Sequence, residues 1–197
     1  MANPETPAAI PKIISLLSFL LQKVAGLNDL NRRVLPRDVS VFHSTTLPSI
    51  SIRKYLERIF KNADCSPCCF VVAFVYIDRI SRMHPSFPIN SLNIHRLLIT
   101  SVMVAAKFAD DICHNNAHYA SIGGVSRAEM NFLELKFVFG LGFHLHVSRS
   151  TYNTYCSYLR YQMLLESPLD YVESPPNIKE RSSGKLEELG FKEDGDW

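Results

Sequence analysis

The sequence predicts an all-α domain, and three observations carry that prediction. The run from Leu97 to Phe108 is apolar on every side of a helix and carries no charge before Lys107, a pattern typical of a central helix with neighbours all round. Other apolar stripes repeat at helical spacing and begin or end at capping residues. Past Pro48, no segment shows the alternating pattern of a strand bounded by turn residues.

Length and composition indicate one good-sized globular domain with flanking segments. The chain has 197 residues, of which 47% are hydrophobic and 20% charged, and its net charge is +2. This near-neutral charge gives no reason to expect a nucleic-acid partner. Five cysteines at irregular spacing are typical of a reducing, intracellular setting. No basic cluster distinguishes the nucleus from the cytoplasm.

The first apolar segment, Ile13 to Val24, is shorter than the roughly 20 apolar residues that span a bilayer. A signal peptide is the alternative, because Lys12 precedes the segment and Ala25-Gly26 follows it. One stripe continues at helical spacing beyond the segment, which favours a helix docked on the core and no membrane partner. The stripe consists of Ile13, Leu16, Leu17, Leu20, Val24 and Leu27. We expect this helix within an N-terminal arm of residues 1–48.

Start and stop signals divide the remaining chain into further helices. Serines, the Ser66-Pro67 pair and an S-x-x-E capping box at Ser126 are typical starts, and Gly123-Gly124 is a typical stop. After Ser167-Pro168 the chain is rich in Pro, Ser, Glu and Lys, so we expect a flexible tail over 167–197. The expected helices cover about 49–60, 68–83, 90–111, 117–122, 126–140 and 150–165.

Enzyme signatures are missing, so we expect neither catalysis nor a cofactor. The chain has no Gly-rich phosphate loop, no G-x-S-x-G and no H-E-x-x-H. Cys65 and Cys68 have C-x-x-C spacing but lack the two further ligands of a zinc site. The histidine pairs at 114 and 118 and at 144 and 146 have no carboxylate or cysteine arranged beside them. The sequence therefore predicts no metal site.

Charged residues inside apolar helices need partners. Asp78 follows a largely apolar run, and Arg53 of the preceding helix is the candidate partner for a structural ion pair. Lys107 and Glu134 have two interpretations. They either form a surface pair worth at most about 1 kcal/mol, or flank an exposed apolar patch and hydrogen-bond to the backbone of a partner. The pattern alone favours the surface pair.

Several motifs resemble the cyclin box. Tyr76-Ile77-Asp78-Arg79 resembles its Y-[IL]-D-R element, Ala105-Ala106-Lys107-Phe108 resembles the A-[AS]-K-[FY] of its third helix, and Leu133-Glu134 resembles its fifth helix. Phe143 and Leu145 resemble the F-x-L that follows. The matches cover about residues 50–146. Together with Ser51-Ile52-Arg53-x-x-Leu56, Glu129-Met130-Asn131 and Gly142-Phe143, they are most similar to plant P-type (U-type) cyclins, relatives of fungal phosphate-response cyclins.

The resemblance implies a five-helix box over 49–146, with flanking helices in the arm and over 147–166. It also implies a regulatory subunit that binds and activates a cyclin-dependent kinase as a heterodimer, in cell division or nutrient-linked control. Residues matching Lys107 and Glu134 contact the kinase beside its αC helix in that family. Apolar positions pack around them, and here these are Val104, Phe108, Val138, Phe143 and Leu145.

Some features depart from the family or stay open. Ile52 and Ile59 stand where the family usually has Met and Trp, so docking of substrate R-x-L motifs is not implied. A helical transcription-factor-like adaptor is the alternative function, although only one box and no basic surface are expected. Arg32-Arg33-Val34-Leu35 has the R-x-x-L form of a degradation motif. Ser167-Pro168 and Ser174-Pro175 are possible proline-directed phosphorylation sites.

Overall fold

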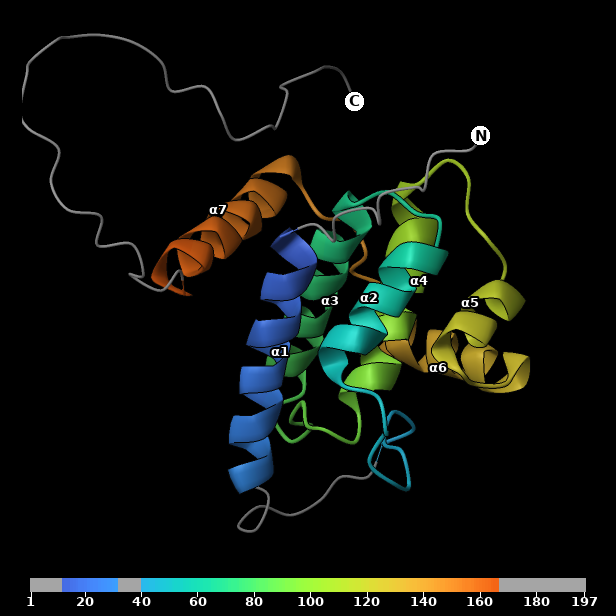
Figure 1. The fold of residues 1–197 in the computed structure, drawn as a ribbon. Coiled ribbons are helices and arrows are strands. Elements are labelled where there is room, and N and C mark those ends of the chain that lie inside the picture. The colour runs from blue at the N-terminus through green and yellow to red at the C-terminus, as the bar shows by residue number, and fades with distance from the viewer. Residues whose placement is uncertain (1–11, 32–39, 167–197) are drawn as a thin grey trace, which may run out of the picture. The chain divides into compact units, whose positions relative to one another are not determined.

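The computed structural model of the chain describes residues 12–31 and 40–166, and this part contains seven α-helices and no strand (Figure 1). The predicted all-α fold is confirmed. The expected tail, the Arg32–Leu35 motif and both Ser-Pro pairs lie outside the described residues. The helices are α1 (Lys12–Asn31), α2 (Ile52–Asn62), α3 (Cys68–Met83), α4 (Ile94–Ala109), α5 (Asn116–Gly123), α6 (Arg127–Gly140) and α7 (Arg149–Glu166).

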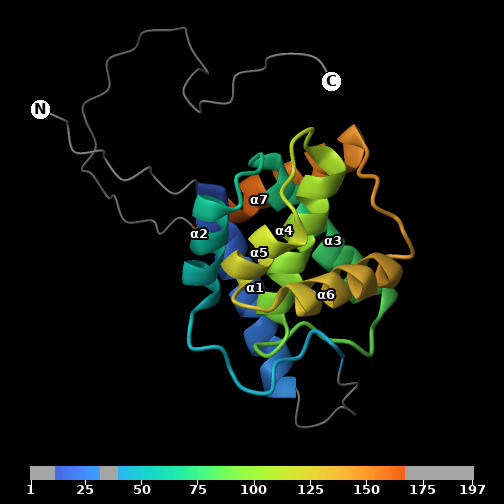
Figure 2. The ribbon, with the colours of Figure 1, turned by 90° about the vertical axis from the view of Figure 1, so that its right-hand side faces the viewer.

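Helix α4 is the central element, as its sequence predicts. It packs against α2, α3, α5 and α6, and Figure 2 shows α5 and α6 in front of it. Every residue from Leu97 to Ala106 is buried. The hydroxyls of Thr100 and Ser101 donate to the carbonyls of Arg96 (2.7 Å) and Leu98 (2.9 Å), so these polar groups are satisfied within the helix.

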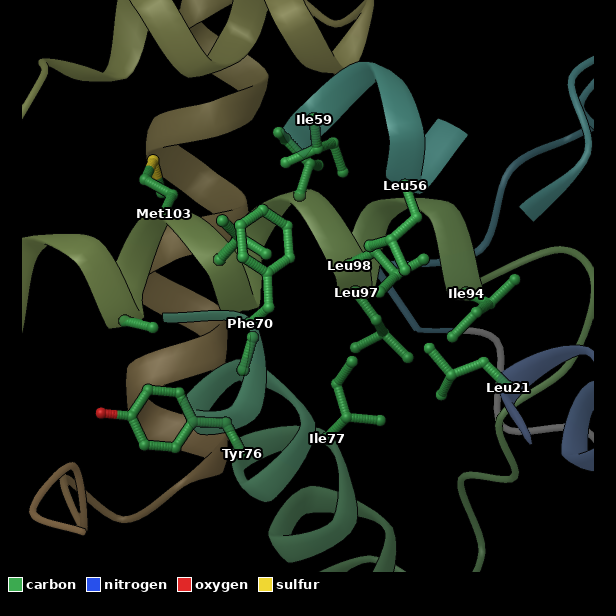
Figure 3. Close-up of a cluster of buried hydrophobic side chains, with 14 of the residues drawn as sticks. Leu21, Leu56, Ile59, Phe70, Tyr76, Ile77, Ile94, Leu97, Leu98 and Met103 are labelled. Carbon is green, nitrogen blue, oxygen red and sulfur yellow. The ribbon is translucent and has the colours of Figure 1, made fainter. Parts of the chain in front are cut away.

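The core around α4 contains side chains from all seven helices. Leu97 and Leu98 lie in it with residues of α1, α2 and α3 (Figure 3). Full burial of one such aliphatic side chain stabilises the fold by about 1.5–3 kcal/mol. The labelled members are Leu21, Leu56, Ile59, Phe70, Tyr76, Ile77, Ile94, Leu97, Leu98 and Met103.

Helix α1 docks on the core, but through a stripe that differs from the predicted one. It is the helix, among the described residues, whose length and hydropathy would allow it to cross a membrane. In the fold it packs against α2 and α7. Val24 and Leu27 of the predicted stripe are exposed, because the buried face is rotated around the helix. That face consists of Ile14, Leu16, Leu17, Leu20, Leu21 and Ala25.

Capping explains most helix starts. Ser51 Oγ accepts a hydrogen bond from Lys54 N (3.3 Å), and Ser126 Oγ accepts one from Glu129 N (3.1 Å). The expected capping box is only half formed, because the Glu129 carboxylate pairs with Arg96 at 2.5 Å. Helix α4 begins at Ile94 instead of Asn90, since the residues before it form a turn closed by Asn90 Oδ1 and Leu92 N (3.0 Å).

The predicted ion pair between Arg53 and Asp78 is wrong. Arg53 Nε lies 3.0 Å from Glu57 Oε1 one turn along α2, and its side chain is 62% exposed. Asp78 pairs with Arg82 Nε (2.9 Å) one turn along α3 and accepts a hydrogen bond from the Tyr155 hydroxyl of α7. Each charge thus has a partner four residues away on its own helix, and the long-range partner of Asp78 is a hydroxyl group.

Replacing Arg53 tests this correction. Because an exposed pair one turn apart contributes roughly 0.3–0.5 kcal/mol, we expect Arg53→Ala to lower the free energy of unfolding by about that amount. Leu98→Ala, which opens a cavity beside the buried α4, should lower it by about 2–5 kcal/mol. Urea denaturation of both variants gives the comparison. If Arg53→Ala lowered the free energy of unfolding as much as Leu98→Ala does, the result would support the buried ion pair between Arg53 and Asp78.

Candidate protein-binding site

The predicted Lys107 and Glu134 come together at one end of α4. Lys107 lies in the last turn of α4, and its Nζ is 2.7 Å from Oε1 of Glu134 on α6. Their side chains are 29% and 26% exposed, so the pair is partly shielded and still reachable from solvent. Because α4 and α6 pack directly against each other, the position of each charge is set by the core.

Asn116, the first residue of α5, links the two charged side chains. Its Oδ1 accepts a hydrogen bond from Lys107 Nζ, and its Nδ2 donates to Glu134 Oε2 at 2.6 Å. Nδ2 also lies 2.7 Å from Asn131 Oδ1. The Lys107–Asn116–Glu134 cluster therefore joins α4, α5 and α6 through their side chains.

The cluster retains hydrogen-bonding capacity. An ammonium has three donors, and Lys107 uses two of them on acceptors in the described part of the chain. Each carboxylate oxygen of Glu134 accepts one hydrogen bond within that part, and each has two lone pairs. One N–H and further lone pairs thus remain for a partner.

The apolar side chains predicted to accompany the charged pair differ in exposure. Phe108 and Phe143 are 52% and 63% exposed, while Val138 and Leu145 are partly buried against the core. Val104 is 3% exposed, so its prediction as a surface contact is corrected. It belongs to the stretch of α4 that other helices enclose, one turn before Lys107.

Helix α6 has a second apolar face that the predicted site did not include. Met130, Leu133 and Phe137 form its buried inner face. The α6 outer face consists of Phe132, Leu135 and Phe139, which are 46–59% exposed. Its spacing of three and four residues was visible in the sequence, but it did not show which face of α6 is exposed.

The turn after α6 projects Phe143 outward beside this face. The rings of Phe139 and Phe143 lie 4.9 Å apart. Phe143 has a φ of 61°, a conformation that costs a bulky residue energy and needs support from its surroundings. The amide of Phe143 donates to Val138 O at 3.1 Å, which closes the turn on α6.

Helix α3 holds the loop segment that follows through hydrogen bonds to its carbonyl groups. Tyr76 Oη donates to Leu145 O (2.7 Å), and Arg79 Nη1 donates to the carbonyls of His144 (2.7 Å) and His146 (3.1 Å). Burial raises the pKa of Tyr76 to about 12, so its hydroxyl stays a donor even near pH 10, where an exposed tyrosine ionises. Arg79 and Met83 line a surface pocket of about 640 Å³ together with residues 143–146.

Chemically, this region is suited to binding. Partly desolvated charges beside exposed aromatic side chains are typical of the energetically important centre of a protein–protein interface. Spacing could have indicated Asn131, since it lies three residues before Glu134 on α6. A single amide such as Asn116 has no comparable signal in the sequence.

Comparison with known proteins identifies the family of the chain. Residues 13–145 match the family model described as Cyclin. The chain is 59% identical over 177 residues to Cyclin-U4-1 of Arabidopsis thaliana, covering 89% of this chain and 88% of that protein. It is 45% identical over 183 residues to Cyclin-P4-1 of Oryza sativa subsp. japonica, covering 90% and 84%. The predicted resemblance is confirmed: the chain belongs to the cyclin family of regulatory proteins, among the plant U- and P-type cyclins.

Proposed function

We propose that this cyclin binds a cyclin-dependent kinase through the Lys107–Asn116–Glu134 cluster and the exposed apolar residues around it, and activates the kinase. The observation that carries the proposal is a half-shielded Lys–Glu pair with unused hydrogen-bonding capacity, next to which the chain continues with the exposed Phe108. Family membership supports a kinase as the partner. The complex is a heterodimer inside the cell, in keeping with the five free thiols.

Activation follows from selective binding. A protein kinase transfers phosphate efficiently only when the lysine of its β3 strand pairs with the glutamate of its αC helix. A cyclin that binds this αC position more tightly than others shifts the kinase population towards it. Moving a population from about 1:99 to 99:1 requires roughly 5.5 kcal/mol of differential affinity.

The site has two means of supplying that preference. Hydrogen bonds from charged groups contribute about 1.5–3 kcal/mol each and depend steeply on direction. Lys107 and Glu134 therefore favour one placement of the αC backbone over others. The apolar side chains of Phe108, Val138, Phe143 and Leu145 contribute affinity by leaving water, at about 25 cal/mol per Å² buried.

Asn116 makes the site rigid before the kinase arrives. Long lysine and glutamate side chains lose rotamer freedom when a partner fixes them, which costs roughly 0.5–1.5 kcal/mol per side chain. The amide of Asn116 already holds both, through Lys107 Nζ and Glu134 Oε2. Much of that entropy loss therefore occurs on folding.

Alanine variants of the charged pair test the proposal. We expect Lys107→Ala and Glu134→Ala each to weaken binding to a purified plant cyclin-dependent kinase at least tenfold, which corresponds to about 1.4 kcal/mol. Calorimetric titration measures the affinity, and phosphorylation of a model peptide measures activation. The matched control is Lys61→Ala, an exposed lysine in the last turn of α2. Wild-type affinity in both variants would mean that Lys107 and Glu134 form only an ordinary surface salt bridge.

Asn116→Ala separates the bridging role from the contacts themselves. It leaves both charges in place and removes the group that orients them, so we expect a smaller loss of kinase affinity, about threefold to tenfold. Combining it with Lys107→Ala should weaken binding by less than the product of the two single effects, because both act through one cluster. Independent effects in this double-mutant cycle would contradict the bridging role of Asn116.

A further inference from the structure

Two thiols and a carboxylate lie together where α3 begins and α4 ends. The Sγ atoms of Cys65 and Cys69 and a carboxylate oxygen of Asp110 all lie within 4.8 Å of one another. Cys65 precedes α3, Cys69 is in its first turn, and Asp110 is the C-cap of α4. The packing of α3 along α4 brings these segments together although 41 residues separate Cys69 from Asp110.

The carboxylate is already oriented towards the thiols. Asp110 Oδ2 accepts a hydrogen bond from Ser66 N (2.9 Å) and one from Cys69 Sγ (3.4 Å), and the Ser66 hydroxyl donates to Oδ1. The Cys69 proton thus lies between a sulfur and a carboxylate oxygen, two atoms that ligate metals. Hydrogen bonds to a ligating carboxylate, such as those from Ser66, are the usual support of a metal ligand.

Burial and ligand type fit a metal site. Cys69 is buried, whereas Cys65 and Asp110 are partly exposed, which leaves a path for an ion. Thiolate sulfur combined with a carboxylate oxygen is a ligand set that zinc accepts in tetrahedral geometry.

We propose that Cys65, Cys69 and Asp110 bind one Zn²⁺ ion, with a water molecule in the fourth position. On binding, the thiol protons of Cys65 and Cys69 pass to the solvent, and two sulfur–zinc bonds and one oxygen–zinc bond form. Tetrahedral bonds of about 2.3 Å place two sulfurs roughly 3.8 Å apart. The observed spread of up to 4.8 Å therefore closes by small side-chain movements.

This proposal differs from the sequence prediction of no metal site. The sequence drew attention to Cys65 and Cys68, which lacked further ligands, and gave no reason to place Asp110 beside them. The fold instead places Cys69 with Cys65 and supplies Asp110 from another helix. Asp110 lies three residues after Lys107, so a bound ion would tie the end of α4 to the start of α3.

Zinc titration of the reduced full-length chain tests the proposal without any kinase. We expect one equivalent of Zn²⁺ to be taken from a chromophoric indicator, and the melting temperature to rise until a chelator is added. Substitution with Co²⁺ should give the absorption of cobalt bound to thiolate in a tetrahedral site. Cys65→Ser, Cys69→Ser and Asp110→Asn should each weaken zinc binding at least tenfold. Cys113→Ser, which removes an exposed cysteine, is the matched control.

Clear outcomes overturn the site. Absence of zinc uptake by the wild-type chain, or a cobalt spectrum without thiolate absorption, would show that the thiols serve only in packing. Unchanged affinity in Cys65→Ser or Asp110→Asn would also reject it, as would an equal loss in Cys113→Ser. If Cys69→Ser does not fold, the cobalt spectrum of the wild-type chain and the Cys65→Ser variant still test the site, because Cys65 is partly exposed.

Discussion

The enclosure of α4 by other helices is the constraint on which the rest of the structure depends. An ammonium group is strongly disfavoured in an apolar interior, so Lys107 marks the point where the enclosure ends. The same packing sets α6 against α4 and thereby brings Glu134 within 2.7 Å of Lys107. Core packing thus fixes the relative positions of Lys107 and Glu134. Their salt bridge does not have to supply the free energy that holds α4 and α6 together.

Helices α4 and α6 show why apolar content alone does not identify a binding surface. Both are apolar over most of their circumference, yet α4 is covered by helices on all sides and α6 keeps an exposed outer face. A large unpartnered apolar face beside fixed charges is typical of an interaction surface. The turn at Phe143, held in a conformation with positive φ, extends that face beyond the end of the helix.

The sequence predicted features that depend on local order. Apolar periodicity and capping residues placed the helices to within a few residues, and the end of the buried run identified Lys107. Side-chain pairings between residues that only the tertiary fold brings together were harder to predict from the sequence. Arg53 and Asp78 each had an alternative partner four residues away, and α1 carried two overlapping apolar stripes. Asn116 and Asp110 gain their significance only from the residues that the fold brings to them.

One turn of α4 anchors both the proposed kinase site and the proposed zinc site. Lys107 points to α5 and α6 through Asn116 and Glu134, while Asp110 points to the start of α3 through Ser66 and Cys69. A displacement of this turn would disturb both sets of contacts together. The polar contacts on its two sides therefore reinforce each other in holding Lys107 still. A rigid lysine is what a site needs if it is to select one position of a partner's helix by directional hydrogen bonds.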